Sequence, residues 1–241
     1  MDIRGYQPTS LIEWPGKIAA VVFTGGCNFR CPFCHNPDLV DPNKQAELKD
    51  YSEQFIIKDL ESRKKWVDGV AVTGGEPTLQ PDLIGFLKQV RRIGLGTMLE
   101  TNGSRPKILG ELLIKKAVDF IAMDYKTAFS DYEKAVRIRN QGLIVKKSMR
   151  MVVASGLPYE FRTTVVPTIH DEELLVKMAK DLKALIENCG LKIEDLNWVL
   201  QSFRPNNCLD PDFEKIKPFS EVQINIFLKA VWDIVPGVKK R

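Results

Sequence analysis

The sequence predicts an α/β protein built as a partial (βα)6 barrel of mostly parallel strands. Two observations support this prediction. Six short runs rich in Val, Ile and Phe end in polar or glycine-rich turns, and stretches with helical spacing lie between most of them. Strands that alternate with helices indicate βαβ units, and six strands are too few for a closed barrel of eight.

Each element is predicted from its own pattern. The predicted strands are residues 18–23, 69–72, 96–99, 119–123, 159–166 and 196–200. Three predicted helices have apolar faces formed by Leu83, Phe86, Leu87 and Val90, by Leu174, Leu175, Met178, Leu182 and Leu185, and by Ile224, Phe227, Leu228, Val231 and Val235. Ser220 is the predicted N-cap of the last helix, and residues 130–155 are predicted to be helical with a break near Gly142.

Size and composition favour a single domain over residues 1–241. The predicted core is about residues 17–202, with a lead-in over 1–16 and a C-terminal loop and helix over 203–241. The net charge of +4 is mild and does not favour nucleic-acid binding. No apolar run reaches the roughly 18 residues that span a bilayer, and no signal-peptide core is visible. We therefore expect a cytoplasmic protein without a membrane partner.

Polar groups follow all six predicted strands. Because ligands bind at the carboxyl ends of parallel strands, these groups are expected to face one cavity. Each alone could be a turn or an ion pair, but their joint placement favours a site. In chain order the strand ends carry the cysteine loop, Gly74-Gly75-Glu76-Pro77, Thr101-Asn102, Asp124 with Lys126, Arg162, and Gln201 with Arg204.

The cysteine loop contains three of the five cysteines, Cys27, Cys31 and Cys34. Clustered thiols in a reducing compartment indicate metal binding or catalysis more than a disulfide framework. Thiolates select zinc, copper(I) or iron–sulfur clusters. His35 could complete a zinc site, although it directly follows Cys34 and would struggle to reach the same ion. A 4Fe–4S cluster held by three cysteines would leave one iron open to an outside ligand.

The CxxxCxxC spacing, with Phe33 before the last cysteine and His35-Asn36-Pro37 after it, resembles the radical S-adenosylmethionine superfamily. It is similar in particular to the glycyl-radical-enzyme activases, and among these to the group that activates anaerobic ribonucleoside-triphosphate reductases. The segments 9–17 and 201–205 carry the same resemblance, which covers essentially the full chain. It implies a partial barrel of the radical S-adenosylmethionine type.

The resemblance also implies roles for single residues. The three cysteines would hold one 4Fe–4S cluster, whose fourth iron is chelated by S-adenosylmethionine. Glu76 and the backbone of Gly74 and Gly75 would bind the methionyl amine. The other implied cofactor contacts are Phe33 at the adenine, Thr101 and Asn102 at the ribose, Asp124 at a hydroxyl or at a backbone amide of the partner, and Lys126 and Arg162 at the carboxylate.

Several residues have simpler interpretations. Cys189 lies at a predicted helix end and Cys208 in a loop rich in Pro and Asn, and two lone cysteines cannot hold a second cubane, so no auxiliary cluster is expected. His170 is interpreted as a residue at a helix start, and His35 as a support for the cysteine loop. For Gln201 and Arg204, substrate docking and a purely structural role are both open.

The implied activity is formation of a 5′-deoxyadenosyl radical that removes a hydrogen from a glycine of a partner protein. The expected partners are a glycyl-radical enzyme, anaerobic ribonucleotide reductase in the first place, and a one-electron donor such as flavodoxin or ferredoxin. Alternatives are an activase of the formate-lyase type, a radical enzyme acting on a small molecule, and a non-catalytic zinc or iron–sulfur module. Gly74-Gly75-Glu76 separates the enzymes from the binding module, which would have no need of it.

Overall fold

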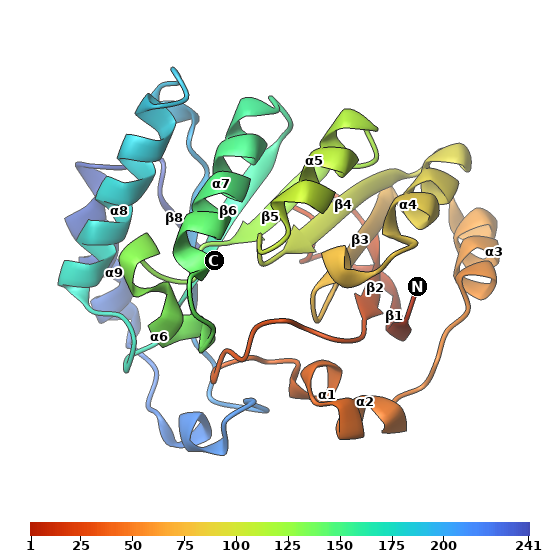
Figure 1. Cartoon of the computed structure of the whole chain (residues 1–241), viewed down its shortest axis with the longest axis horizontal. Coiled ribbons are helices and arrows are strands. Elements are labelled where there is room, and N and C mark those ends of the chain that lie inside the picture. Colours follow the sequence, from red (N-terminus) through yellow and green to blue (C-terminus); the bar gives the residue numbers. More distant parts are fainter. The chain divides into compact units, whose positions relative to one another are not determined.

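A computed structural model describes all residues, 1–241, and contains one eight-stranded sheet (Figure 1). The strands follow one another in chain order, and the sheet is open because β1 and β8 are its two edges. The first pair, β1 and β2, is antiparallel, whereas β2–β3, β3–β4, β6–β7 and β7–β8 are parallel. The strands are β1 (Ile3–Ser10), β2 (Ala19–Thr24), β3 (Gly69–Gly74), β4 (Gly96–Thr101), β5 (Phe120–Asp124), β6 (Tyr159–Val165), β7 (Trp198–Ser202) and β8 (Lys239–Lys240).

Nine α-helices and four short 3-10 helices connect the strands. The α-helices are α1 (Pro37–Val40), α2 (Pro42–Glu47), α3 (Glu53–Arg63), α4 (Leu83–Arg92), α5 (Pro106–Ile114), α6 (Tyr132–Val136), α7 (Gln141–Ala154), α8 (Glu172–Glu187) and α9 (Glu221–Trp232). The 3-10 helices are Pro77–Leu79, Phe129–Asp131, Ile193–Asp195 and Pro211–Lys215. No helix is both long and apolar enough to cross a membrane.

All six strands predicted from the sequence are present as β2 to β7, which confirms the predicted class. Two strands were not predicted. β1 lies in the segment interpreted as a lead-in, and it contains Gly5 and Pro8, which interrupt a strand pattern. Pro is tolerated at a sheet edge because it lacks a backbone N–H, and β1 is an edge strand. β8 has only two residues, too few for a pattern.

The predicted helical faces are largely confirmed. All four residues of the predicted α4 face are buried. In α8, Leu174 is only partly buried, and in α9 Leu228 is only partly buried. Ser220 caps α9 as predicted and forms a capping box with Gln223, but the helix ends at Trp232, so Val235 is buried beyond it. The break expected near Gly142 separates α6 from α7.

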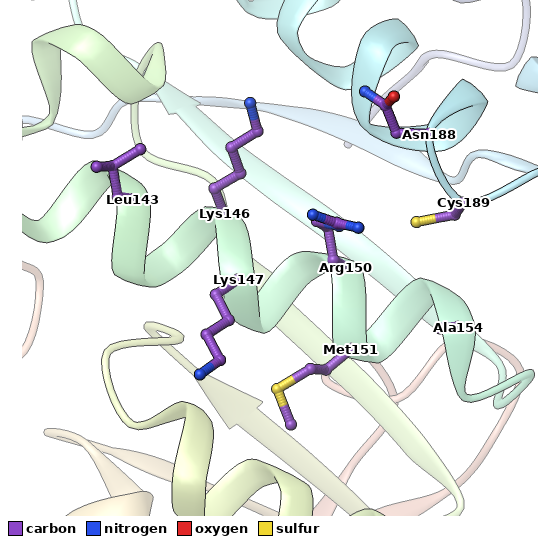
Figure 2. A pocket seen from close by; sticks show the side chains of 8 residues that line it. All are labelled: Leu143, Lys146, Lys147, Arg150, Met151, Ala154, Asn188 and Cys189. Atoms are coloured by element: carbon purple, nitrogen blue, oxygen red, sulfur yellow. The ribbon is translucent and has the colours of Figure 1, made fainter.

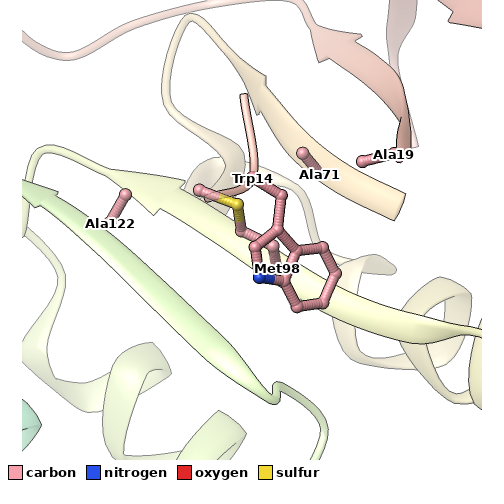
Figure 3. Close-up of a cluster of buried hydrophobic side chains, with 5 residues drawn as sticks. All are labelled: Trp14, Ala19, Ala71, Met98 and Ala122. Atoms are coloured by element: carbon pink, nitrogen blue, oxygen red, sulfur yellow. The ribbon is translucent and has the colours of Figure 1, made fainter. Parts of the chain in front are cut away.

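The chain divides into two compact units. The first comprises Met1–Asn28, Asn36–Thr101 and Lys107–Ala122; the second comprises Phe29–His35, Asn102–Pro106 and Met123–Arg241. In the first unit the Trp14 ring packs over the starts of β2, β3 and β4 in a cluster of Trp14, Ala19, Ala71, Met98 and Ala122 (Figure 3). A Cβ atom at Gly69 or Gly96 would lie 2.6 Å and 3.0 Å from this ring, so small residues at the strand starts make room for it.

In the second unit, helices α7 and α8 bury apolar faces and β6 pairs with β7 and β7 with β8. The break before α7 has a steric reason. A Cβ atom at Gly142 would lie 1.8 Å from the carbonyl oxygen of Phe129, so only glycine allows the two segments to approach this closely. Arg137 and Asn140 have φ values of 56° and 60°, in the left-handed region that interrupts a helix.

Candidate functional site

In the first unit, three parallel strands end beside one another, and a candidate site residue lies at or just after the end of each strand. β2 and β3 are paired in register up to Thr24 and Gly74, and β3 is paired with β4. Cys27 follows β2, Glu76 follows β3, and Thr101 is the last residue of β4. The carboxyl edge of this part of the sheet therefore carries five of the predicted site residues, which are Cys27, Gly74, Gly75, Glu76 and Thr101.

The two glycines are required by close contact with the protein's own backbone. Gly74 has φ +119°, and a Cβ atom there would lie 2.3 Å from the amide nitrogen of Thr24. A Cβ atom at Gly75 would lie 2.0 Å from the carbonyl oxygen of Gly26. The amides of Gly75 and Glu76 donate to the carbonyls of Thr24 and Gly26, at 2.9 Å and 2.8 Å. The glycine pair thus fixes the segment that leads directly into Cys27.

The Glu76 carboxylate is fully buried and held by hydroxyl and amide donors. One of its oxygens, Oε1, accepts hydrogen bonds from the Thr78 amide at 3.0 Å, from the Thr78 hydroxyl, and from the Thr101 hydroxyl at 2.7 Å. Glu76 and Thr101, predicted to contact different parts of a cofactor, are therefore bonded to each other. A buried carboxylate needs such partners, because an unsatisfied buried charge is costly.

In the second unit, the other half of the cysteine loop is held by an internal turn and by a backbone hydrogen bond to the end of α6. The Cys34 amide donates to the Cys31 carbonyl at 3.1 Å, which closes a turn between these two cysteines. The Arg30 amide donates to the carbonyl of Val136 at 3.0 Å. Cys31 is buried, Cys27 and Cys34 are partly buried, and no cysteine of the chain is joined in a disulfide. The three loop cysteines are divided between the two units.

Asp124 and Lys126 form an ion pair next to the cysteine loop. The distance from Lys126 Nζ to Asp124 Oδ2 is 2.9 Å, and Lys126 Nζ lies 5.8 Å from the centre of the Phe33 ring. Burial disfavours the Lys126 cation, but Asp124 and the Cys31 thiolate outweigh it and hold the pKa of Lys126 above its ordinary value. Lys126 is therefore a permanent positive charge close to a predicted metal ligand.

Side chains from neighbouring elements hold the backbone of this Asp-x-Lys segment. The Tyr132 hydroxyl donates to the Asp124 carbonyl and accepts from the Lys126 amide, both at 3.2 Å. The Thr163 hydroxyl donates to the carbonyl of Tyr125 at 2.5 Å. Because Tyr132 and Thr163 are buried, the segment has little freedom to shift.

His170 completes this frame, which the sequence did not indicate. It does precede α8, as predicted, but its ring also links two loops. Nδ1 accepts from the Val166 amide at 3.0 Å, so the proton sits on Nε2, which donates to the Lys126 carbonyl at 2.9 Å. Only 2% of the residue is exposed, and burial lowers the pKa of His170 to about 4, against the opposing effect of its backbone hydrogen bonds. The ring is therefore neutral near pH 7 and links the backbone of Val166 to that of Lys126.

Arg162, predicted to meet a cofactor carboxylate, has a protein carboxylate beside it. Its Nε donates to Glu160, and both side chains are buried on the same face of β6. Glu160 also accepts from Arg241 at 3.1 Å. Glu160 was not among the predicted site residues, although residues two apart on a strand share a face and the strand period of two therefore indicates the pair.

The remaining candidates are two turn residues, Asn102 and His35, and two residues at or after the end of β7, Gln201 and Arg204. The side chain of Asn102 accepts from the Ser104 amide at 2.9 Å and so forms an Asx turn. Gln201 is paired in register with Thr164, and Arg204 is exposed. The His35 ring lies 6.1 Å from that of Phe203, and burial, Arg204 and Lys126 lower its pKa.

The remaining cysteines lie in different surroundings. Cys189 follows α8 and lines a surface groove of about 790 Å³ with Asn188 and one face of α7 (Figure 2). Gly190 has φ +71°, typical of the residue that ends a helix. Cys208 is buried, and its segment runs along the cysteine loop.

An open, mostly parallel sheet with a three-cysteine loop after one strand and a Gly-Gly-Glu turn after the next defines the class of protein. Residues 21–182 match the family model described as Radical SAM superfamily. The chain is 31% identical over 219 residues to the "Putative glycyl-radical enzyme activating enzyme MJ1227" of Methanocaldococcus jannaschii, covering 89% of this chain and 85% of that protein. It is also 31% identical over 187 residues to the pyruvate formate-lyase-activating enzyme of Clostridium pasteurianum, covering 75% and 76%.

Among solved structures, a domain of the pyruvate-formate lyase-activating enzyme from Bacteroides vulgatus superposes with a TM-score of 0.54 at 20% identity, covering 72% of this chain and 97% of that one. At this identity the match shows the fold alone. Together these findings place the chain in the radical S-adenosylmethionine superfamily, within its group of glycyl-radical-enzyme activating enzymes.

Enzymes of this superfamily use a 4Fe–4S cluster and S-adenosylmethionine, and the donor set of this chain fits such a cluster. Thiolates are the usual ligands of iron–sulfur clusters, and the three loop thiols are not consumed in disulfides. Lys126 places a positive charge near Cys31, which offsets part of the negative charge that several thiolates bring together.

Proposed function

We propose that this protein activates a glycyl-radical enzyme by removing a hydrogen atom from a glycine of that partner, with anaerobic ribonucleoside-triphosphate reductase as the expected partner. The activase relatives at 31% identity support the class of reaction. The name of the Clostridium pasteurianum relative equally supports a partner of the pyruvate formate-lyase type. The observation that carries the proposal is the CxxxCxxC loop in a chain of this family.

We assign the loop cysteines as ligands of three irons of the cluster. Held by these thiolates, a 4Fe–4S cluster would supply the one-electron reduction of S-adenosylmethionine that is needed for hydrogen abstraction from the partner's glycine. We propose that residues 1–241 work as one catalytic domain. We propose that the cofactor is contacted by the residues that the sequence resemblance implies, which are Phe33, Gly74, Gly75, Glu76, Thr101, Asn102, Asp124, Lys126 and Arg162.

In this proposal, the chain's own residues bind the cofactor and hold its groups in one orientation. Glu76 supplies a buried carboxylate for an ammonium-like group, and Thr101 and Thr78 hold that carboxylate in one orientation. Lys126 supplies a fixed cation for a carboxylate, and Tyr132 and His170 hold its backbone. A reactive radical must be kept from water, and Glu76, Thr101 and His170 are buried side chains with hydrogen-bond partners.

The partner is tested by electron paramagnetic resonance. The anaerobic, reconstituted protein is incubated with S-adenosylmethionine, dithionite and either an anaerobic ribonucleotide reductase or a formate lyase. We expect a glycyl-radical doublet in the reductase and none when its acceptor glycine is replaced by alanine. A doublet only in the formate lyase would identify that enzyme, and not the reductase, as the partner. No doublet in either enzyme would reject the activase assignment.

Metal identity and turnover are tested separately. We expect iron and sulfide in the anaerobically purified protein, and release of 5′-deoxyadenosine on reduction. Cys31→Ala should abolish this release, while the matched variant Cys189→Ala should retain it, because Cys189 lies at the end of α8. A protein that binds zinc alone and never cleaves S-adenosylmethionine would instead be the non-catalytic module.

We also propose a one-electron donor of the flavodoxin or ferredoxin type and a cytoplasmic location. Both follow from the chemistry, since the cluster needs an external electron and its thiols need a reducing compartment. Replacing dithionite by each reduced carrier tests the donor: deoxyadenosine should form with at least one of them.

A further inference from the structure

One segment of the chain carries an excess of positive charge. Residues 134–159 contain six lysines and arginines and no aspartate or glutamate. Their charge exceeds the net charge of +4 for the full chain, so the other residues taken together are slightly acidic. The segment includes all of α7 and lies within one compact unit. A local positive surface of this kind attracts anionic partners and speeds their association.

The six cations of this segment fall into two groups. The three that precede α7 already have acidic partners within the chain, in the pairs Lys134–Asp131, Arg137–Asp210 and Arg139–Glu133. The three in α7, which are Lys146, Lys147 and Arg150, have no carboxylate within ion-pair distance. Lys146 Nζ lies 5.4 Å from the centre of the Phe129 ring. Helix α7 therefore carries three cations whose charge no carboxylate of the chain offsets.

These three cations line the surface groove of about 790 Å³ between α7 and the end of α8. Figure 2 shows Lys146 and Lys147 extending to opposite sides of α7, with Arg150 between them. No acidic residue lines the groove. Leu143, at the start of the same exposed stripe of α7, is 79% exposed, although an apolar side chain of this size gains from burial. The groove therefore combines unpaired positive charge with an exposed apolar side chain.

Helix α7 is attached to loops that carry candidate site residues of the same unit. The Ser148 hydroxyl donates to the Gly103 carbonyl at 2.6 Å, and Gly103 directly follows Asn102. Gly142, near the start of α7, packs against the carbonyl of Phe129, which follows the Asp-x-Lys segment. A partner that reaches these loops would therefore lie next to the first turns of α7, where the groove begins.

We propose that this groove docks an acidic surface of the glycyl-radical enzyme that the protein activates. Carboxylates of the partner would lie opposite Lys147 and Arg150, and an apolar side chain would cover Leu143. This inference rests on the proposed function, because it assigns a second contact surface to the same partner. Its basis is charge complementarity, since these cations lack carboxylates within their own chain.

Two other occupants are less well matched to the groove. A nucleic acid presents phosphates, which would pair with the cations but would leave Leu143 uncovered. An electron donor needs only a small, brief contact. A glycyl-radical enzyme must instead hold a segment of its backbone in the site, and a groove beside the site loops extends the surface that holds it.

The test measures binding of the full-length, reconstituted protein to anaerobic ribonucleotide reductase, and in parallel to a formate lyase, by biolayer interferometry without air. Lys147→Glu combined with Arg150→Glu should raise the Kd for the enzyme that binds by about tenfold or more, because like charges would face each other. The matched control is Lys88→Glu combined with Arg92→Glu, which reverses two exposed cations of α4 outside the groove. It should change the Kd by less than about twofold.

Two further readouts separate charge from folding. Raising sodium chloride from about 50 to about 200 mM should weaken binding of the unmodified protein and of the α4 control, but not of the α7 variant. Leu143→Ser should weaken binding while keeping this salt dependence. Circular dichroism checks that each variant folds, and Lys147→Gln combined with Arg150→Gln replaces a reversal that does not, with a smaller expected rise in Kd.

The outcomes distinguish the docking surface from the proposed function. Equal Kd values for the α7 variant and the α4 control would overturn the inference, as would an unmodified protein that binds neither enzyme. It would also be overturned if the α7 reversal abolished binding to reduced flavodoxin or to a duplex DNA oligonucleotide and left binding to the glycyl-radical enzyme unchanged. Binding that depends on Lys147 and Arg150, without a glycyl-radical doublet, would reject the proposed function alone.

Discussion

Acid should destabilise this protein through His170, before most carboxylates titrate. The buried ring is neutral in the folded protein, with Nδ1 occupied by the Val166 amide, whereas the ring of the unfolded chain takes up a proton near pH 6.5. Between pH 6.5 and pH 4 the unfolded state therefore binds more protons than the folded state. The contribution of His170 to stability is complete above pH 6.5 and falls as the pH drops toward 4.

The difference between an ordinary pKa of 6.5 and the folded value of about 4 corresponds to roughly 3 kcal/mol of unfolding free energy. We expect urea unfolding of the cluster-free protein to show a loss of this order across the interval. His170→Gln removes the titrating group, so its unfolding free energy should vary much less with pH. It should also be lower near pH 7 by about 1–3 kcal/mol, because a buried backbone group loses its partner.

The chain has two histidines, so His35 provides the matched control. Burial and nearby cations also lower the pKa of His35, but the residue is only partly buried. His35→Gln should therefore keep most of the pH dependence. An unfolding free energy that is flat between pH 6.5 and pH 4, or an equal slope in His170→Gln, would refute the reasoning.

Other predictions follow from single contacts. Gly75→Ala places a Cβ atom 2.0 Å from the Gly26 carbonyl oxygen, so we expect a loss of about 1–3 kcal/mol in urea unfolding and less iron bound per chain. The control is Gly85→Ala, whose Cβ atom meets no other atom within 4 Å and lies in α4, so it should raise the unfolding free energy by up to about 1 kcal/mol. Equal unfolding free energies for the two variants would contradict the clash expected at Gly75. Thr101→Val removes a donor to buried Glu76 and should weaken S-adenosylmethionine binding in calorimetry, while Thr101→Ser should preserve it.

The strands and the cysteine loop were predictable because their signals are local. Residues 18–23 are an apolar run bounded by polar turns, and β2 forms there. The buried face of α4 follows from helical spacing, and the spacing of the cysteines lies within eight consecutive residues. Patterns with a short period are read from neighbours in the chain, and the same neighbours determine the backbone conformation.

Tertiary structure alone decided which distant residues meet. β1 is a strand because it pairs with β2, although Gly5 and Pro8 weaken its own pattern. His170 reads as a residue at a helix start until its ring is seen to hold the carbonyl of Lys126. Cys208 lies far along the chain from Cys34, and one backbone hydrogen bond makes them adjacent. Such contacts depend on how the elements pack, and packing joins residues with no regular spacing in the sequence, so no local period can reveal them.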